Sequence, residues 1–170
     1  MRSASSTKPP ARRSVAKATA TATAIATAKA ATPAAAPVLL DTGPLVALYA
    51  PDDPWHQRAT QWVADFNGAL HTVGSVLAEA AWQLPARDRS MIARLAQRGA
   101  FQVHVPDASG HARMAWLLDK YADLDPDWAD IELLWLAEST GIQRIATLDA
   151  ADFSVYRIHG RKAFDLVWPG

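Results

Sequence analysis

Short apolar runs alternate along the chain with longer segments in which apolar residues recur every three or four positions. The short runs predict β-strands, and the longer segments predict amphipathic helices. The predicted strands are residues 38–40, 69–73, 101–105, 144–149 and 164–168. Because helices separate these strands, the connections are crossovers and the sheet is expected to be parallel. The pattern predicts an α/β fold with a parallel sheet of about five strands and helices on both faces.

The predicted helices begin and end at residues that suit helix termini. They are residues 45–49, 55–66, 76–84, a helix between Asp88 and Gly99, a helix that begins at Asp107, and residues 129–140. An aspartate accepts a hydrogen bond from the first free N–H groups of a helix, and glycine readily takes the left-handed conformation that ends one. The segment Asp41-Thr42-Gly43-Pro44 predicts a turn between the first strand and the first helix.

The first 37 residues differ in composition from the rest of the chain. They are low-complexity Ala, Thr, Ser, Lys and Pro, with six basic residues and no acidic residue. Such a segment buries too little apolar surface to offset its ordering entropy, so we expect a disordered tail over residues 1–37 and a folded domain over residues 38–170. An organelle transit segment, a solvated tail and a misassigned start all fit this composition.

The neutral overall charge conceals an acidic folded part. Residues 38–170 carry eleven basic and seventeen acidic residues, a formal net charge of −6. This charge argues against binding nucleic acid through bulk electrostatics alone, so bound cations would have to offset the repulsion.

Several kinds of site are excluded or disfavoured by composition and spacing. The absence of cysteine excludes disulfides, thiolate zinc sites and a cysteine nucleophile. No pair of histidines has the helical spacing of a zinc site, and no glycine-rich phosphate loop or Ser-His-Asp spacing is present. No stretch of about 20 apolar residues predicts a membrane span, and no secretory signal is evident. We therefore expect a cytoplasmic protein without a membrane partner.

Four acidic residues occupy positions that the predicted fold would bring together. Asp41 and Asp149 each follow an apolar strand, and the carboxyl ends of parallel strands meet at one edge of the sheet. Glu79 is the only acid in an apolar helix, and Asp130 lies in the first turn of another. Each acid alone has an ordinary explanation as a turn former, a solvent-facing residue or a helix-dipole partner. A functional site is therefore indicated by the shared placement of the four acids in the predicted fold, and not by any one of them.

Clustered carboxylates repel one another, and a hard divalent cation removes this conflict. Mg²⁺ and Mn²⁺ prefer carboxylate and water oxygens. Such ions can orient a water molecule for attack on a phosphodiester, lower its pKa and stabilise the leaving oxygen. The pattern therefore indicates metal-dependent phosphodiester hydrolysis, in which a water molecule and not a side chain is the nucleophile.

At these motifs the sequence resembles the PIN-domain family, and most closely its VapC-like toxins. The resemblance rests on Val38-Leu39-Leu40-Asp41-Thr42-Gly43-Pro44-Leu45, the helix around Glu79, Asp127-Trp128-Ala129-Asp130 and Ala146-Thr147-Leu148-Asp149-Ala150-Ala151-Asp152-Phe153, in that order. It covers about residues 38 to 168. It implies a PIN-like sheet between helices and a Mg²⁺- or Mn²⁺-dependent endoribonuclease.

The resemblance also implies roles for individual residues and for partners. The family's four acids match Asp41, Glu79, Asp130 and Asp149, and three further residues fit secondary positions around the site: Thr42, Asp127 and Asp152. The implied partners are an RNA substrate, a cognate antitoxin protein and a second copy of the chain in a homodimer. Two alternatives stay open: a catalytically silent PIN-like module that binds RNA or a protein, and a structure-specific DNA nuclease.

Two other features carry less specific interpretations. The tryptophans of predicted helices are expected in the core or at an interface: Trp62, Trp82, Trp116 and Trp135. Trp55 and Trp128 flank the candidate cleft. Arg157, His159, Arg161 and Lys162 form a basic run after the last candidate ligand, which fits either a solvated turn or a rim that guides phosphates.

Overall fold

The computed structural model describes residues 35–168, which form one parallel sheet covered by helices. The strands are β1 (Val38–Leu40), β2 (Leu70–Val73), β3 (Gln102–His104), β4 (Arg144–Ala146) and β5 (Asp165–Leu166). The helices are α2 (Thr42–Tyr49), α3 (His56–Asp65), α4 (Gly74–Gln83), α5 (Arg89–Gln97), α6 (Ala108–Lys120), the 3₁₀ helix η1 (Ala122–Leu124), α7 (Trp128–Thr140) and α8 (Ala150–Val155). The predicted tail, except its last three residues, lies outside the described residues.

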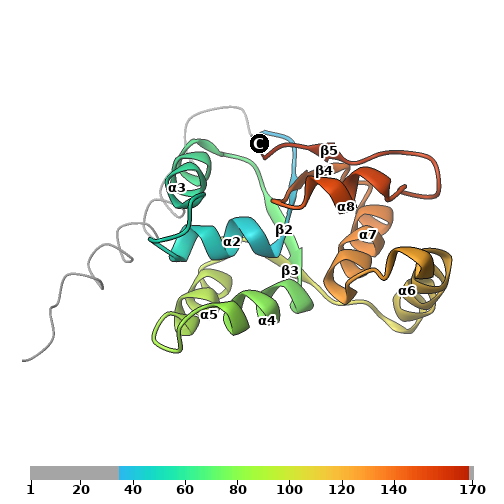
Figure 1. The fold of residues 1–170 in the computed structure, drawn as a ribbon, viewed down its shortest axis with the longest axis horizontal. Coiled ribbons are helices and arrows are strands. Elements are labelled where there is room, and N and C mark those ends of the chain that lie inside the picture. Colours follow the sequence, from blue (N-terminus) through green and yellow to red (C-terminus); the bar gives the residue numbers. More distant parts are fainter. Residues whose placement is uncertain (1–34, 169–170) are drawn as a thin grey trace, which may run out of the picture.

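The strand order is β3-β2-β1-β4-β5, and every neighbouring pair is parallel. β1 occupies the centre of the sheet, and all three of its residues are buried, as expected for an apolar strand covered on both faces. In Figure 1 the helices α2 to α5 lie on one side of the central strands, and α6 and α7 lie on the other. The predicted α/β fold with five parallel strands is confirmed.

Helix α7 packs in the interior and brings its N-terminus to the centre of the molecule. Seven of its thirteen residues are buried, including Ile131, Leu133 and Leu134. Asp127 caps the helix through a hydrogen bond from Ala129 N to Asp127 Oδ1 of 2.8 Å. Gly141 ends the helix with φ +74°, as predicted for a glycine in this position.

The predicted turn after the first strand is wrong, because α2 begins directly at Thr42. Asp41 is the N-cap residue, and its side chain accepts a hydrogen bond from Thr42 N. Pro44 is tolerated because the N–H groups of a first helical turn have no partner within the helix. The Asp-Thr-Gly-Pro composition of a turn therefore also suits a capped helix start.

The predicted fourth strand is too long, and α8 was not predicted. β4 ends at Ala146, so Asp149 does not follow the strand directly. Asp149 instead caps α8, with Asp152 N donating a 3.0 Å hydrogen bond to Asp149 Oδ1. α8 has only six residues, too few for its apolar spacing to stand out in the sequence.

The predicted positions of the tryptophans are partly corrected. Trp62 stacks on Phe66 and contacts Trp168, and Trp135 is partly buried against the core. Trp82 is 83% exposed and Trp116 is 49% exposed, so these two do not belong to the core of this chain. Both lie on helix faces directed to solvent, and a place at an interface stays a prediction. No helix within residues 35–168 has the length and apolar character that crossing a bilayer requires.

Candidate metal centre

Asp41 lies at the carboxyl end of the central strand and is held there by three hydrogen bonds. Its backbone N–H donates to Ala146 O of β4 at 3.1 Å. Its side chain accepts from Thr42 N at Oδ1, at 2.6 Å, and from Thr147 Oγ1 at Oδ2, at 2.7 Å. The residue is only 8% exposed, so this carboxylate is oriented by the ends of two neighbouring strands.

Thr147 is a residue of this site that the sequence analysis did not single out. It is buried in the loop between β4 and α8, and it accepts a 2.8 Å hydrogen bond from Asp149 N through the same oxygen that donates to Asp41. One hydroxyl thus connects two of the predicted metal ligands. The sequence signal that could have identified Thr147 is its position two residues before Asp149, in Ala146-Thr147-Leu148-Asp149.

Glu79 reaches the site from α4, which follows the neighbouring strand β2. Glu79 Oε2 accepts a 2.8 Å hydrogen bond from Thr42 Oγ1. Thr42 is the first residue of α2 and Glu79 lies in the middle of α4, so this contact joins two helices that each follow a strand of the sheet. Thr42 therefore contacts both acids, Asp41 through its backbone N–H and Glu79 through its hydroxyl.

Asp130 reaches the site from the first turn of α7. Tyr156 OH donates a 3.3 Å hydrogen bond to Asp130 Oδ2. Tyr156 follows α8 directly, is almost fully buried, and packs edge-on against Phe153 and Tyr121. Tyr156 is a second contributor that sequence reasoning missed, because nothing in the local pattern distinguishes it from an ordinary core aromatic.

Burial and mutual repulsion make the deprotonated acids of this cluster unfavourable. Burial is the largest cause that raises the pKa of Asp130 to about 7, and the charges of Asp41, Asp127 and Asp152 add to it. Burial also raises the pKa of Asp41, against the hydrogen bonds from Thr147 and Thr42, and the charges of Asp149 and Asp127 contribute. These effects place the acids within electrostatic reach of one another.

The remaining predicted residues belong to the same cluster. Burial raises the pKa of Glu79 despite the hydrogen bond from Thr42, and the charges of Asp127 and Asp41 raise it further. The pKa of Asp152, which lies at the solvent side, is also raised by burial and by the charge of Asp149. The structure thus brings together all seven residues named from sequence, which are Asp41, Thr42, Glu79, Asp127, Asp130, Asp149 and Asp152.

The donor set fits a hydrated divalent cation better than a fully dehydrated one. Among residues 35–168, no three His, Asp or Glu side chains lie close enough to enclose a bare metal ion. Carboxylates that repel one another separate, while Mg²⁺ keeps several water ligands and takes only one or two carboxylates directly. Hard oxygen donors with raised pKa values are the groups that such an ion would stabilise in the charged form.

Comparison with known proteins places this fold in a family. The family model that describes the PIN domain matches residues 38–158. A comparison with curated protein sequences found no match. The crystal structure of Mycobacterium tuberculosis VapC20, a toxin that cleaves the sarcin–ricin loop, is similar with a TM-score of 0.60 and 21% identity over 71% of this chain and 97% of that one. At this identity the likeness concerns the fold. The chain therefore belongs to the PIN-domain family.

Proposed function

We propose that this protein is a Mg²⁺- or Mn²⁺-dependent endoribonuclease of the VapC toxin type. Asp41, Glu79, Asp130 and Asp149 are the proposed metal ligands, directly or through water. Thr42, Asp127 and Asp152 are secondary members of the site. The observation that carries this proposal is the convergence of these acids around Asp41 at the carboxyl edge of the sheet, where the pKa values of Asp41, Glu79 and Asp130 are raised in a way that a cation would offset.

The chain's own residues position the acids before any substrate binds. Thr147 and Thr42 N hold both oxygens of Asp41, and Thr42 Oγ1 holds Glu79. Tyr156 orients Asp130. Bound divalent ions would supply positive charge for the phosphate and a water molecule of lowered pKa. The outer acids Asp127 and Asp152 would accept hydrogen bonds from the water ligands of such ions.

VapC20 is described as a toxin that cleaves the sarcin–ricin loop, which is an RNA loop. For this chain we infer the same class of substrate, single-stranded or loop RNA, because unpaired nucleotides can enter a cleft that a duplex cannot. The proposal includes a cognate antitoxin that covers the acid cluster, and a homodimer. Gel filtration of the chain alone and with the product of a neighbouring gene would test both partners.

The decisive experiment measures cleavage by the full chain and by two isosteric variants, Asp41→Asn and Asp130→Asn. Each variant keeps the size of the side chain and removes its charge, so we expect both to lose RNA cleavage and to keep the wild-type circular dichroism spectrum. Chelation should abolish wild-type cleavage, and added Mn²⁺ should restore it. Undiminished metal-dependent cleavage in both variants would reject the assignment.

The same experiment separates the two alternatives. RNA and DNA oligonucleotides of the same sequence are digested side by side, and a preference for DNA would indicate a DNA nuclease. Binding of RNA without cleavage at any concentration of Mg²⁺ or Mn²⁺ would indicate a catalytically silent module. The raised pKa values favour the catalytic reading, because repelling buried acids destabilise a domain that never binds a cation.

A further inference from the structure

A tight hairpin between α8 and β5 carries four basic side chains. Residues 157–162, here called the basic hairpin, contain Arg157, His159, Arg161 and Lys162. Ile158 N donates to Lys162 O at 2.8 Å, and Lys162 N donates to Ile158 O at 3.1 Å. Gly160, with φ +70°, allows the chain to turn between these two bonds. The basic residues are thus presented by a closed turn of defined backbone geometry.

A buried carboxylate anchors this hairpin to the helices beneath it. Glu138 of α7, whose side chain is 5% exposed, accepts a 2.8 Å hydrogen bond from His159 N. The same carboxylate accepts two bonds from Arg113 of α6, at 2.7 and 2.9 Å. Figure 1 shows the segment between α8 and β5 passing beside α7. The hydrogen bond from His159 N thus fixes the hairpin to Glu138 of α7, and the bidentate ion pair with Arg113 fixes Glu138 to α6.

Lys120 of α6 adds a further cation next to the hairpin. Lys120 Nζ lies 4.5 Å from the ring centroid of Tyr121 and 5.4 Å from that of Trp116. The position that a Cβ atom would take at Gly160 is 3.9 Å from the same nitrogen. The basic surface consists of Lys120, Arg157, Arg161 and Lys162. Across residues 35–168, none of these four forms an ion pair with a carboxylate.

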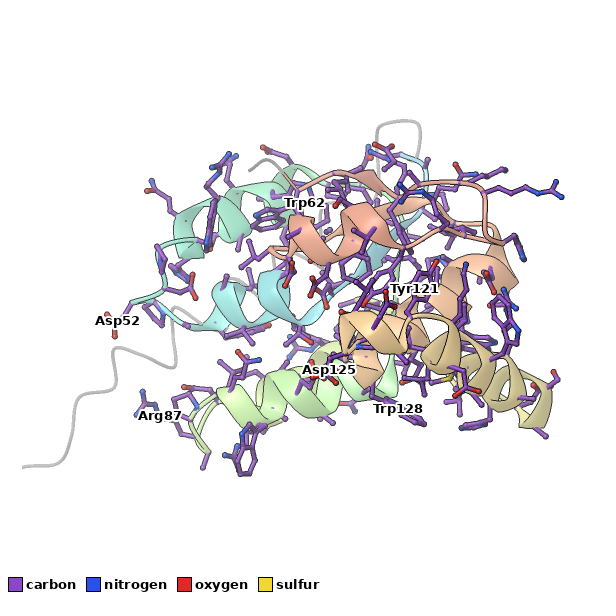
Figure 2. The ribbon with its side chains drawn as sticks, turned by 45° about the vertical axis from the view of Figure 1, so that its right-hand side comes forward. Asp52, Trp62, Arg87, Tyr121, Asp125 and Trp128 are labelled. Atoms are coloured by element: carbon purple, nitrogen blue, oxygen red, sulfur yellow. The ribbon has the colours of Figure 1, made fainter. Side chains whose placement is uncertain are left out.

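The basic surface adjoins the acid cluster through two tyrosines. Tyr156, which donates to Asp130, directly precedes Arg157. Tyr121 packs edge-on against Tyr156 with a centroid distance of 5.2 Å, and its hydroxyl accepts a 3.1 Å hydrogen bond from Arg157 N. In the view of Figure 2, Tyr121 lies between the end of α6 and α8. A strand of RNA that leaves the acid cluster on this side would reach the basic surface next.

We propose that the basic surface binds the phosphate backbone of the RNA next to the scissile phosphodiester. This inference rests on the proposed function. Residues 38–170 carry a net charge of −6, so most of the domain repels a polyanion, and four of its eleven basic residues gather at this one place. Arginine and lysine contacts to phosphates position a nucleic acid without reading its sequence. An acidic polypeptide would be repelled by the adjoining carboxylates, whereas RNA approaches them together with divalent cations.

The test compares the full wild-type chain with the double variant Arg161→Glu/Lys162→Glu. Both side chains are exposed, and both residues take part in the hairpin's hydrogen bonds through their backbones alone, so the fold should be unchanged. The control is Arg87→Glu/Arg94→Glu, which changes the net charge equally on two exposed residues, one in the turn before α5 and one within α5. In the view of Figure 2, Arg87 lies at the left edge of the molecule, and Tyr121 lies to the right of its centre.

Binding of a fluorescent single-stranded RNA is measured by anisotropy in EDTA over a series of salt concentrations. We expect the Kd of the hairpin variant to rise at least tenfold and its salt slope to fall by about 1.4, since each lost phosphate contact lowers the slope by about 0.7. The control should bind like wild type. Because no cleavage is needed, this readout stands even if the wild-type chain proves inactive as a nuclease.

Three outcomes would overturn the inference. The hairpin variant could bind RNA with the wild-type Kd and salt slope. The control could lose as much affinity as the hairpin variant, which would indicate bulk charge. The hairpin variant could keep RNA binding and lose binding of polyglutamate, which would assign the surface to an acidic protein partner.

A cleavage assay gives a second readout. KM for a long RNA should rise in the hairpin variant, while cleavage of a trinucleotide, which is too short to span both the acid cluster and the basic surface, should stay unchanged.

Discussion

Thr147 Oγ1 donates a 2.7 Å hydrogen bond to Asp41 Oδ2, and this contact ties the loop after β4 to the end of β1. Both residues are buried, and β1 and β4 are adjacent parallel strands. The hydroxyl also accepts from Asp149 N at 2.8 Å. A single neutral side chain thus sets the relative positions of two acids that come from segments more than a hundred residues apart.

Replacement of Thr147 tests this positioning role. Thr147→Val keeps the shape of the side chain but leaves Asp41 Oδ2 and Asp149 N without their partner, so we expect a ten- to hundredfold loss of activity, typical of groups that orient metal ligands. The concentration of Mg²⁺ for half-maximal activity should rise, and the free energy of unfolding should fall by about 1–3 kcal/mol.

The matched variant is Thr147→Ser, which retains the hydroxyl and should recover most of the Mg²⁺ affinity. Titration of Mg²⁺ in a cleavage assay and urea unfolding measure the two effects separately. Equal Mg²⁺ requirements in the Val and Ser variants would show that the hydroxyl does not orient Asp41 for the metal.

Tyr156 offers a second test, through the pH dependence of the reaction. Its hydroxyl lowers the pKa of Asp130, which burial and neighbouring charges otherwise raise to about 7. Tyr156→Phe keeps the ring packing and removes this hydrogen bond, so the pKa of Asp130 should rise further. One hydrogen bond contributes about 0.5–1.5 kcal/mol, and about 1.4 kcal/mol corresponds to one pKa unit. We expect the acid limb of the pH–rate profile to move up by about half a unit to one unit.

The measurement is the cleavage rate across a pH series at saturating Mg²⁺. At high pH, where Asp130 is charged in both proteins, the rates should converge. Tyr49→Phe serves as the control, because Tyr49 is a buried tyrosine on α2 with no hydrogen bond to the acids. A uniform loss of activity at every pH, without a shift of the limb, would contradict the proposed contact with Asp130.

Most of the fold followed from sequence because the strands are short apolar runs in a fully covered sheet. Val38-Leu39-Leu40 has no polar position, as expected for a strand that is buried on both faces at the centre of the sheet. The limits of prediction lay at the helix starts. Asp41 and Asp149 were interpreted as a turn residue and a strand end, but each caps a helix, since side-chain caps and turns use the same residues.

The candidate site was predictable in its acids and not in the neutral groups that hold them. Carboxylates at strand ends and helix starts can be placed from topology alone. Thr147 and Tyr156 orient acids through contacts between distant segments, and such contacts depend on side-chain packing that no local pattern encodes. Trp82 was expected in the core or at an interface, and its 83% exposure places it outside the core of this chain.

The raised pKa values predict that the metal-free protein becomes less stable as pH rises. Asp130 has a pKa of about 7 in the folded protein against an ordinary value of 3.8, so the folded protein holds a proton in this interval that the unfolded chain has lost. Its free energy of unfolding therefore falls as pH rises through this window, and the raised pKa values of Asp41 and Glu79 act in the same direction.

Thermal melting in EDTA between about pH 5 and about pH 8 measures this dependence. Added Mg²⁺ should raise Tm strongly at the upper end and little at the lower end, where protons occupy the acids. Asp130→Asn, which cannot lose a proton, should show a shallower pH dependence in EDTA. If that variant followed the wild-type curve at every pH, the buried acid would not be the source of the instability.

Gly43 allows the first turn of α2 to lie close to the loop that carries Asp149. A Cβ atom at Gly43 would come within 2.9 Å of the side chain of Leu148, which is closer than real contacts allow. Gly43→Ala should therefore displace Leu148 and with it Asp149, and we expect cleavage to fall by at least tenfold with a modest loss of stability.

The matched control is Gly74→Ala in the first turn of α4, where no atom lies within 4 Å of the added Cβ atom. That variant should keep its activity and gain about 0.4–1 kcal/mol of stability, because alanine restricts the unfolded chain. The cleavage rates and the unfolding midpoints of the two variants measure these effects. Full activity in Gly43→Ala would mean that the position of Leu148 does not control the position of Asp149.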